Sequence, residues 1–385
     1  MNIRVPSSAT IANCEDALIE LQSRGGADID LLLSTKPRGK ELGAEMSWVQ
    51  FVLTWAKSQS SLRLKTFADG PDDKQIADFT DRLIGLIASL ISDSIQSELN
   101  GIDLTSVYKS AALKRLDLLQ DKRPNLHSRG PTVEIVAADD FVKDKPASLY
   151  PRGGGGERVL GSRVYYKRAA PRLLQAVAPN ENQLNIDEDL VRAFGSLLYE
   201  IFRNTEDHAR VDVYGNAFKH SYRVVHASAA GIKPDHLANA TAGYAPLDTY
   251  IKRFRPNPLK KQLSFINLSI LDSGPGFAQT WTDTPLEELS LADELRATLD
   301  CFSSGTRKLR DEYGKGLDLV RQYLRQNNGF MRLRTGRQSL YYDSIHDQDL
   351  GQPIPMRSWL PEGQEHAGRT EGALLTVLLP FGGTH

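Results

Sequence analysis

Cysteine is scarce in this chain, long apolar runs are missing, and the charges almost cancel. The two cysteines, Cys14 and Cys301, have no metal-ligand or redox spacing, which argues against a cysteine-based metal site and favours a reducing compartment. The most apolar window, residues 83–91, is far too short to span a bilayer. Because 47 basic residues face 48 acidic ones, no global field directs the protein to nucleic acid or to a membrane. With no signal-peptide pattern at residues 1–6, we expect a cytoplasmic protein.

At 385 residues, with 40% hydrophobic and 25% charged side chains, the chain can form two or three domains with buried cores. Residues 1–105 alternate strand and helix patterns, which predicts a small α/β layer domain. Its longest predicted helix carries an apolar stripe from Ile76 to Ile95. The domain loosely resembles a STAS-type regulatory domain, although no motif supports that resemblance. The predicted strands cover residues 2–6, 28–33 and 62–67.

Residues 106–184 are expected to form a helical connecting region that contains a glycine-rich loop. Four consecutive glycines, residues 153–156, would suit a phosphate-binding loop, but Glu157 follows where such a loop needs lysine and serine or threonine. A flexible loop is therefore the favoured interpretation. The basic side chains between Arg152 and Arg172 could contact nucleic acid or an acidic partner, but we favour a solvated face.

The most informative stretch is residues 197–209, which has apolar side chains on one helical face. Glu200 and Asn204 lie one turn apart on the other face. Taken alone, this pattern is typical of a solvated helix surface. Three later stretches change the interpretation. They are the strand 263–271 with its Asp272-Ser273-Gly274-Pro275-Gly276 extension, the segment Tyr313-Gly314-Lys315-Gly316-Leu317, and the apolar strand 372–380.

In this order, the four stretches resemble the N box, the D-x-G-x-G box, the second glycine box and the closing strand of the GHKL ATPases. This superfamily includes DNA gyrase, the large heat-shock chaperones, histidine kinases and MutL, and the resemblance covers about residues 185–382. It implies that residues 185–385 form a two-layer α/β sandwich of the Bergerat type, with a mixed sheet and helices on one face. It also implies a mobile lid at about residues 277–313, and ATP and Mg²⁺ as ligands.

The resemblance implies roles for the polar residues of the first box. Asn204 would supply the oxygen that holds Mg²⁺, a hard cation that otherwise keeps water and phosphate oxygens. Glu200 would accept the proton of the attacking water. Asp207 and His208 follow the asparagine and would line the nucleotide site. Each of these side chains also suits an ordinary exposed helix surface.

The two glycine boxes would hold the base and the phosphates. Asp272 would accept a hydrogen bond from the exocyclic amine of adenine, while Gly274 and Gly276 would let the backbone approach the nucleotide. Gly314-Lys315-Gly316-Leu317 precedes a predicted helix, whose free N–H groups would face the phosphates. The family often has threonine after the glycine of its last strand, but Ala373 stands there in this chain. This departure removes one hydroxyl from the expected site.

Three functions agree with this pattern. The first is an ATPase whose lid closure controls self-association or the binding of a protein partner through the N-terminal region. The second is a kinase that phosphorylates a separate protein, since the one histidine before the box region, His127, is followed by Ser128 rather than by an acid. The third is a nucleotide-gated binding module with negligible turnover. The sequence does not indicate the pathway, the partner or the oligomeric state.

Overall fold

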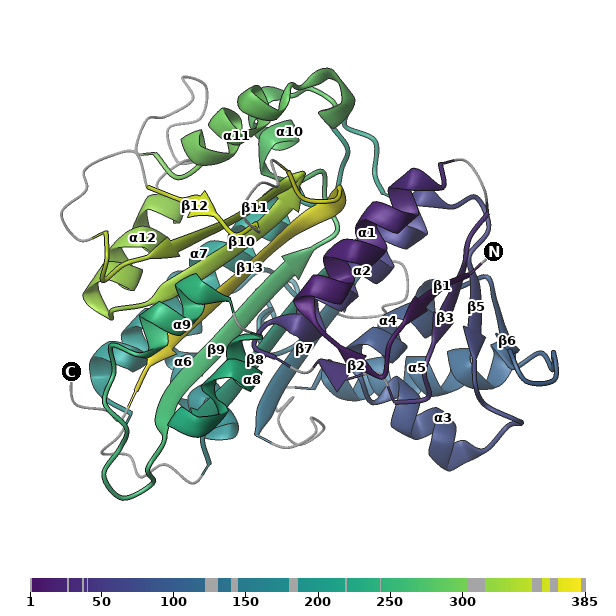
Figure 1. Ribbon diagram of the computed structural model, residues 1–385, viewed down its shortest axis with the longest axis horizontal. Coiled ribbons are helices and arrows are strands. Elements are labelled where there is room, and N and C mark those ends of the chain that lie inside the picture. Colours follow the sequence, from purple (N-terminus) through teal and green to yellow (C-terminus); the bar gives the residue numbers. More distant parts are fainter. Residues whose placement is uncertain are drawn as a thin grey trace.

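A computed structural model gives the structure of the protein, which forms two packed units (Figure 1). In the described part of the chain, no helix has the length and apolar character needed to cross a membrane. The described residues are 2–25, 28–36, 38–39, 41–121, 131–139, 145–179, 186–218, 220–242, 244–303, 316–347, 355–360 and 366–381.

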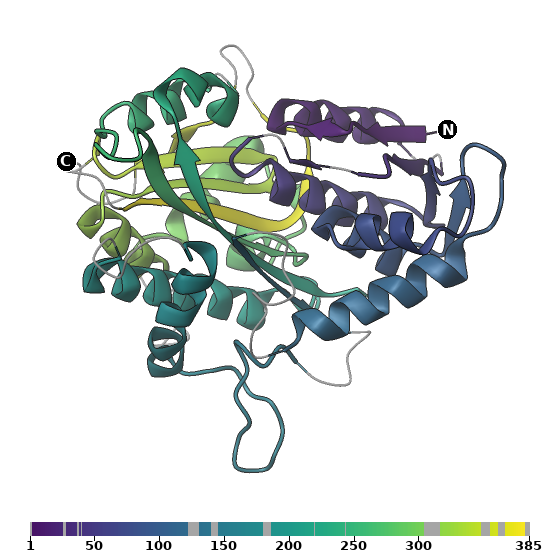
Figure 2. The ribbon, with the colours of Figure 1, turned by 90° about the horizontal axis from the view of Figure 1, so that it is seen from below.

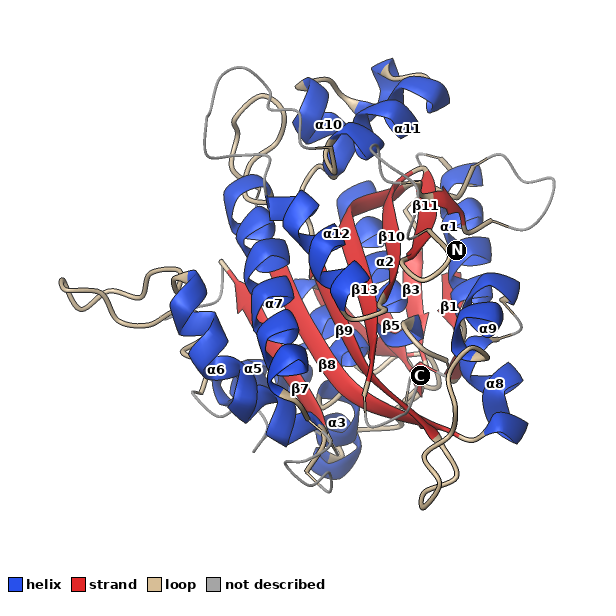
Figure 3. Ribbon diagram, turned by 90° about the vertical axis from the view of Figure 1, so that its left-hand side faces the viewer, coloured by secondary structure: helices blue, strands red, loops and turns tan. Residues whose placement is uncertain are grey.

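The larger unit is built on a seven-stranded sheet with the order β12-β11-β10-β13-β9-β8-β7 (Figure 3). Every neighbouring pair is antiparallel, so the expected mixed sheet is wrong. The reason lies in the position of β13. Strands β9 and β10 run in the same direction, but β13 lies between them and pairs antiparallel with both. The strands are β7 (Thr132–Ala138), β8 (Tyr222–Ile232), β9 (Leu263–Asp272), β10 (Phe330–Gly336), β11 (Gln338–Asp343), β12 (Arg357–Ser358) and β13 (Thr370–Pro380).

Three helices cover one face of this sheet: α6 (Arg163–Val177), α7 (Glu188–His208) and α12 (Gly316–Gln326). Helix α7 lies between the other two and packs against both. It begins at an N-cap, where the Asp187 side chain accepts a hydrogen bond from the Leu190 N–H at 2.6 Å. Its apolar stripe faces the sheet, and the remaining side of the helix is free to carry polar groups.

The opposite face of the sheet is also covered, so the expectation of helices on one face is wrong. Helix α2 (Ala44–Ser58) packs against β13 and β9, and its tryptophans share one core with Leu271 and Leu374 of the sheet. Strand β9 is buried at nine of its ten positions, which explains the near-continuous apolar run of residues 263–271. Figure 2 shows the N-terminal unit lying against the sheet.

The smaller unit has a parallel sheet with the order β1-β3-β5-β6, which confirms an α/β arrangement for the N-terminal region. The predicted long helix through Ile95 is wrong. The chain extends at Arg82 between two short helices, and Ile95 lies in β6. The unit comprises β1 (Asn2–Val5), β2 (Ser8–Ala9), α1 (Ile11–Ser23), β3 (Asp30–Leu33), β4 (Arg38–Gly39), α2, β5 (Arg63–Thr66), α3 (Asp73–Thr80), α4 (Leu83–Ile91), β6 (Ser94–Ser97) and α5 (Thr105–Leu119).

Residues 106–184, expected to be a connecting region, contribute to both units. Helix α5 packs against α3 and α4, whereas β7 forms the edge strand beside β8, and α6 covers the large sheet. The glycine loop 153–156 is exposed and lies outside both sheets. The remaining short helices are η3 (Pro234–His236), α8 (Leu237–Thr241), α9 (Ala245–Ile251), α10 (Phe277–Thr282), η4 (Leu286–Glu288) and α11 (Leu291–Asp300).

Candidate functional site

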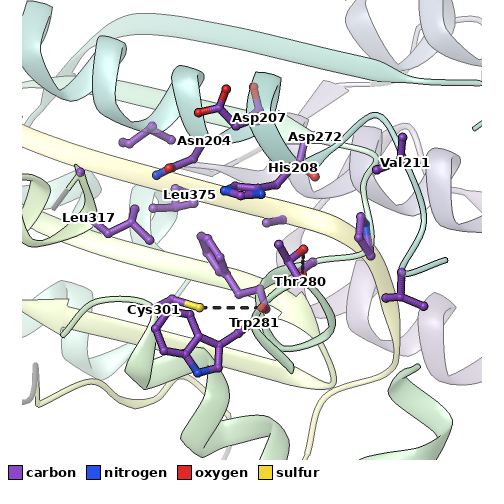
Figure 4. A pocket seen from close by; sticks show the side chains of 18 of the residues that line it. Asn204, Asp207, His208, Val211, Asp272, Thr280, Trp281, Cys301, Leu317 and Leu375 are labelled. Carbon is purple, nitrogen blue, oxygen red and sulfur yellow. Dashed lines mark hydrogen bonds between the residues drawn. The ribbon is translucent and has the colours of Figure 1, made fainter. Parts of the chain in front are cut away.

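A cavity of about 520 Å³ lies between α7, the end of β9, α10 and the start of α12 (Figure 4). It is lined by residues from all four of the stretches that the sequence singled out, from Ile201 in the first to Leu375 in the last. The residues that were expected at a nucleotide site and line this cavity are Asn204, Asp207, His208, Asp272, Gly276, Gly316 and Leu317.

Asn204 lies on the cavity side of α7. Among the described residues its amide nitrogen is buried and has no hydrogen-bond partner, so the amide is available to a ligand. Figure 4 shows Asn204 and His208 reaching from α7 toward the opposite wall. The Asp207 carboxylate belongs to the rim and forms an ion pair with Arg203, with an Nε–Oδ2 distance of 3.4 Å.

Glu200 lies one turn before Asn204 and is 4% exposed. A Cβ atom on Gly316 would lie 3.1 Å from Glu200 Oε2 and 3.9 Å from the Asn204 amide, so the start of α12 directly faces both side chains. Burial raises the pKa of the Glu200 carboxyl, and the guanidinium of Arg163 opposes that rise. A carboxylate whose pKa lies closer to neutrality is a better proton acceptor near pH 7.

Arg163 is a site residue that the sequence interpretation missed. It begins α6, forms an ion pair with Glu200, and lies over the Tyr199 ring with its Cζ atom 5.5 Å from the ring centroid. It belongs to the basic group between Arg152 and Arg172, which we interpreted as a solvated face. Arg163 is indeed solvated, with its side chain 42% exposed, but the packing of α6 on α7 also brings it to the Glu200 carboxylate.

Asp272 ends β9 and is 8% exposed at the cavity wall. Its Oδ1 atom accepts a hydrogen bond from the Gly274 N–H at 2.9 Å, which leaves further acceptor capacity on the carboxylate. Burial raises the pKa of this carboxyl to about 6, and Lys57 and Arg223 oppose that rise. Near neutral pH the Asp272 carboxyl is therefore ionised, and it can accept hydrogen bonds at a buried position of the cavity wall.

The two glycines after Asp272 are required by close packing within the protein. A Cβ atom on Gly274 would lie 2.6 Å from Ala209 Cα at the end of α7. Gly276 has a φ of +88° and a Cβ atom there would lie 2.6 Å from Thr335 Oγ1. Both glycines thus fix the path of the turn that carries Asp272, and Gly276 also lines the cavity.

Gly314 and Lys315, expected to contact phosphates, lie outside the described residues, as does the stretch 304–313 of the expected lid. The described part of the lid forms α10, η4 and α11. It is anchored to the large sheet through buried Glu294, whose Oε2 atom accepts from Arg337 Nε at 2.6 Å. Trp281 and Cys301 from this segment line the cavity and were not expected there.

No protein-family profile, curated protein or solved structure matches this chain. Within the described ranges, no group of three or more His, Cys, Asp or Glu side chains is placed to hold a metal ion. The expected resemblance to the GHKL family therefore depends on the sequence boxes alone. The site offers an amide nitrogen that has no partner within the described ranges, two buried carboxylates and a helix N-terminus.

Proposed function

We propose that this protein binds Mg-ATP in the cavity and hydrolyses it, as a GHKL-type ATPase. The observation that carries the proposal is the meeting of Asn204, Asp272 and Gly316 at one cavity, together with Glu200 directly beside Gly316. A volume of about 520 Å³ lies in the range of small-molecule sites.

The described residues fit the parts of the ligand in different ways. Asp272 suits the exocyclic amine of adenine, because an ionised carboxylate accepts hydrogen bonds and would repel the carbonyl of guanine. Gly316 and Leu317 begin the 11-residue helix α12, whose first N–H groups and positive end suit phosphate oxygens. Asn204 lines the cavity, where its amide oxygen would hold Mg²⁺, and its amide nitrogen is buried there without a partner among the described residues.

Hydrolysis needs a positioned water and a group that takes its proton. Glu200 would take this proton, and its position next to the N-terminus of α12 supports that role. As the water oxygen bonds to the terminal phosphorus, the bond between that phosphorus and the bridging oxygen of the leaving ADP breaks. The water proton moves to the Glu200 carboxylate. Bound magnesium supplies neutralisation of the phosphate charge. The Arg163 ion pair lowers the basicity of Glu200 and keeps the carboxylate oriented until substrate binds.

The first prediction separates hydrolysis from binding. Glu200→Gln should bind Mg-ATP with nearly wild-type affinity and hydrolyse it on the order of 10²–10⁴-fold more slowly, because the proton acceptor is lost. Asn204→Ala should instead weaken the magnesium-dependent part of binding. Calorimetry with a non-hydrolysable ATP analogue and a phosphate-release assay measure the two effects.

The control for both variants is a thermal unfolding midpoint close to that of the wild type. Hydrolysis at the wild-type rate in Glu200→Gln would show that another group takes the proton. A wild type that binds the analogue but never releases phosphate would contradict the ATPase proposal and favour a binding module. Equal affinity of the wild type for ATP and GTP, or unchanged ATP affinity in Asp272→Asn, would contradict the role of Asp272.

A further inference from the structure

One helix of the N-terminal unit contacts the turn that carries Asp272. Gln50, Thr54 and Lys57 lie on one face of α2 at helical spacing, in a helix that is otherwise buried and largely apolar. Gln50 Nε2 donates to the Glu371 carbonyl at 3.2 Å, and Thr54 Oγ1 accepts from the Glu371 N–H at 3.0 Å. This polar stripe therefore attaches α2 to the start of β13.

Lys57 extends this stripe to the turn itself. Its Nζ atom donates to the carbonyl oxygens of Ser273 and of Gly274, the latter at 3.4 Å, and forms an ion pair with Glu371 at 3.4 Å. The Phe218 ring covers the ammonium group, with 3.7 Å between Nζ and the ring centroid. The side chain is 20% exposed, so these contacts replace most of its water.

The turn depends on tight contacts on the same side. The Gly372 N–H donates to the Gly274 carbonyl at 2.8 Å, and Gly372 has a φ of +70°. A Cβ atom on Gly372 would lie 1.8 Å from the Asp272 carbonyl oxygen. Lys57, Gly274 and Glu371–Gly372 thus form one contact group directly behind the carboxylate that lines the cavity.

We infer that Lys57 is a positioning residue for the proposed base-binding turn, so that the N-terminal unit supports the nucleotide site from behind that turn. Its ammonium group holds the Ser273 and Gly274 carbonyls, and through them the direction of the Asp272 carboxylate. The inference deepens the proposed function and rests on it. The N-terminal unit, acting through this turn, would then change the affinity for the adenine end of the ligand.

The charges around Asp272 come from several elements, and Asp207 and His208 of α7 line the same cavity. Lys57 on α2 and Arg223 on β8 are cationic, and Arg223 is itself paired with Asp139 and Glu206. Glu371 on β13 forms an ion pair at 3.1 Å with Arg369, the residue before that strand, next to Lys57. Burial raises the pKa of the Asp272 carboxyl to about 6 and Lys57 opposes the rise, so removing Lys57 raises this pKa further.

The test compares Lys57→Met and Lys57→Arg in the full chain, by calorimetry with the magnesium complex of a non-hydrolysable ATP analogue. We expect Lys57→Met to bind on the order of 10-fold more weakly, because charged hydrogen bonds to the turn are lost. Lys57→Arg should restore much of the affinity. Lys57→Met should bind AMP more weakly than the wild type does, by the same factor as for the ATP analogue, because the effect arises at the base and not at the phosphates.

The pH profile gives a readout that a purely structural role would not move. Nucleotide affinity should fall as the pH decreases through about 6, when the Asp272 carboxyl becomes protonated. In Lys57→Met this midpoint should move to higher pH. Lys74→Met, at an exposed position on α3 of the same unit, is the matched control and should leave affinity and midpoint unchanged.

If Lys57→Met unfolds, hydrogen exchange of residues 272–276 in Glu371→Gln keeps the inference testable. This milder variant removes the charge that orients Lys57 and should reduce protection of the turn. Wild-type affinity in Lys57→Met, equal losses in the methionine and arginine variants, or unchanged protection in Glu371→Gln would overturn the inference. Failure of the wild type to bind the analogue would instead overturn the proposed function.

Discussion

At the scale of single residues, the two carboxylates of the site owe their properties to different neighbours. Glu200 of α7 is buried and pairs with Arg163 of α6, whereas Asp272 is buried at a strand end, where Lys57 is the cation that most lowers its pKa. In both cases burial favours the neutral form and the cation opposes it. The pKa of each carboxyl therefore depends partly on a cation that is distant in the sequence.

Arg163 provides the residue-scale prediction. Arg163→Ala removes the cation that lowers the pKa of Glu200, so this pKa should rise further. Since the carboxylate form takes the proton, the acid limb of the pH dependence of kcat should move to higher pH. Steady-state phosphate release between pH 5 and pH 9 measures the shift. Arg168→Ala, at an exposed position on the same helix, is the control, and an acid limb identical in both variants would contradict the assignment.

At the scale of elements, α10 and the residue that follows α11 form one wall of the cavity, and that residue carries a thiol. Cys301 follows α11, is half-buried, and its Sγ atom lies 3.3 Å from the Ala297 carbonyl. The second cysteine, Cys14, is 2% exposed, and burial raises its thiol pKa well above the usual value. Because the thiolate is the reactive form, Cys14 should remain unmodified in the folded protein.

This difference gives the element-scale prediction. N-Ethylmaleimide should modify one thiol per folded chain, and that thiol should be Cys301. The magnesium complex of a non-hydrolysable ATP analogue should slow the reaction several-fold, because Cys301 lines the proposed nucleotide site. Intact-mass spectrometry over time measures the rate. Cys301→Ser serves as the control and should take up no label, and a rate that saturating nucleotide leaves unchanged would count against the site.

At the scale of the whole molecule, the N-terminal unit and the large sheet share one core. Trp48 and Trp55 of α2 belong to the same buried cluster as Val224, Leu271 and Leu374 of the sheet. The interface also contains buried charge, because Arg334 of β10 forms a two-pronged ion pair with Glu15 of α1 at 2.9 and 3.0 Å. A helix that covers a sheet in this way stabilises both units together.

The molecule should therefore unfold in a single cooperative transition. Leu374→Ala should lower the free energy of unfolding by about 2–5 kcal/mol, as is typical for a truncated core leucine. Urea unfolding is followed by tryptophan fluorescence and by far-UV circular dichroism. Within each protein, wild type or variant, the two probes should give coincident curves. Two separate transitions, with Leu374→Ala affecting only one of them, would show that the units fold independently.

Local spacing determined the parts of the chain that carry chemistry. The helical period of residues 197–209 set Glu200 and Asn204 on one face, and the apolar run 263–271 predicted a buried strand that ends at Asp272. The glycine after residue 315 predicted the start of a helix, which is α12. These features depend on the side-chain periods of helices and strands, which a sequence shows directly.

Only the tertiary structure decided how these parts are combined. The insertion of β13 between β9 and β10 made the sheet antiparallel, whereas the family resemblance had implied a mixed sheet. The packing of α2 on the second face of the sheet placed Lys57 behind the Asp272 turn, 216 residues away from Ser273 in the chain. The packing of α6 on α7 likewise joined Arg163 to Glu200. Such pairings depend on burial shared between distant segments, and no local period in the sequence encodes them.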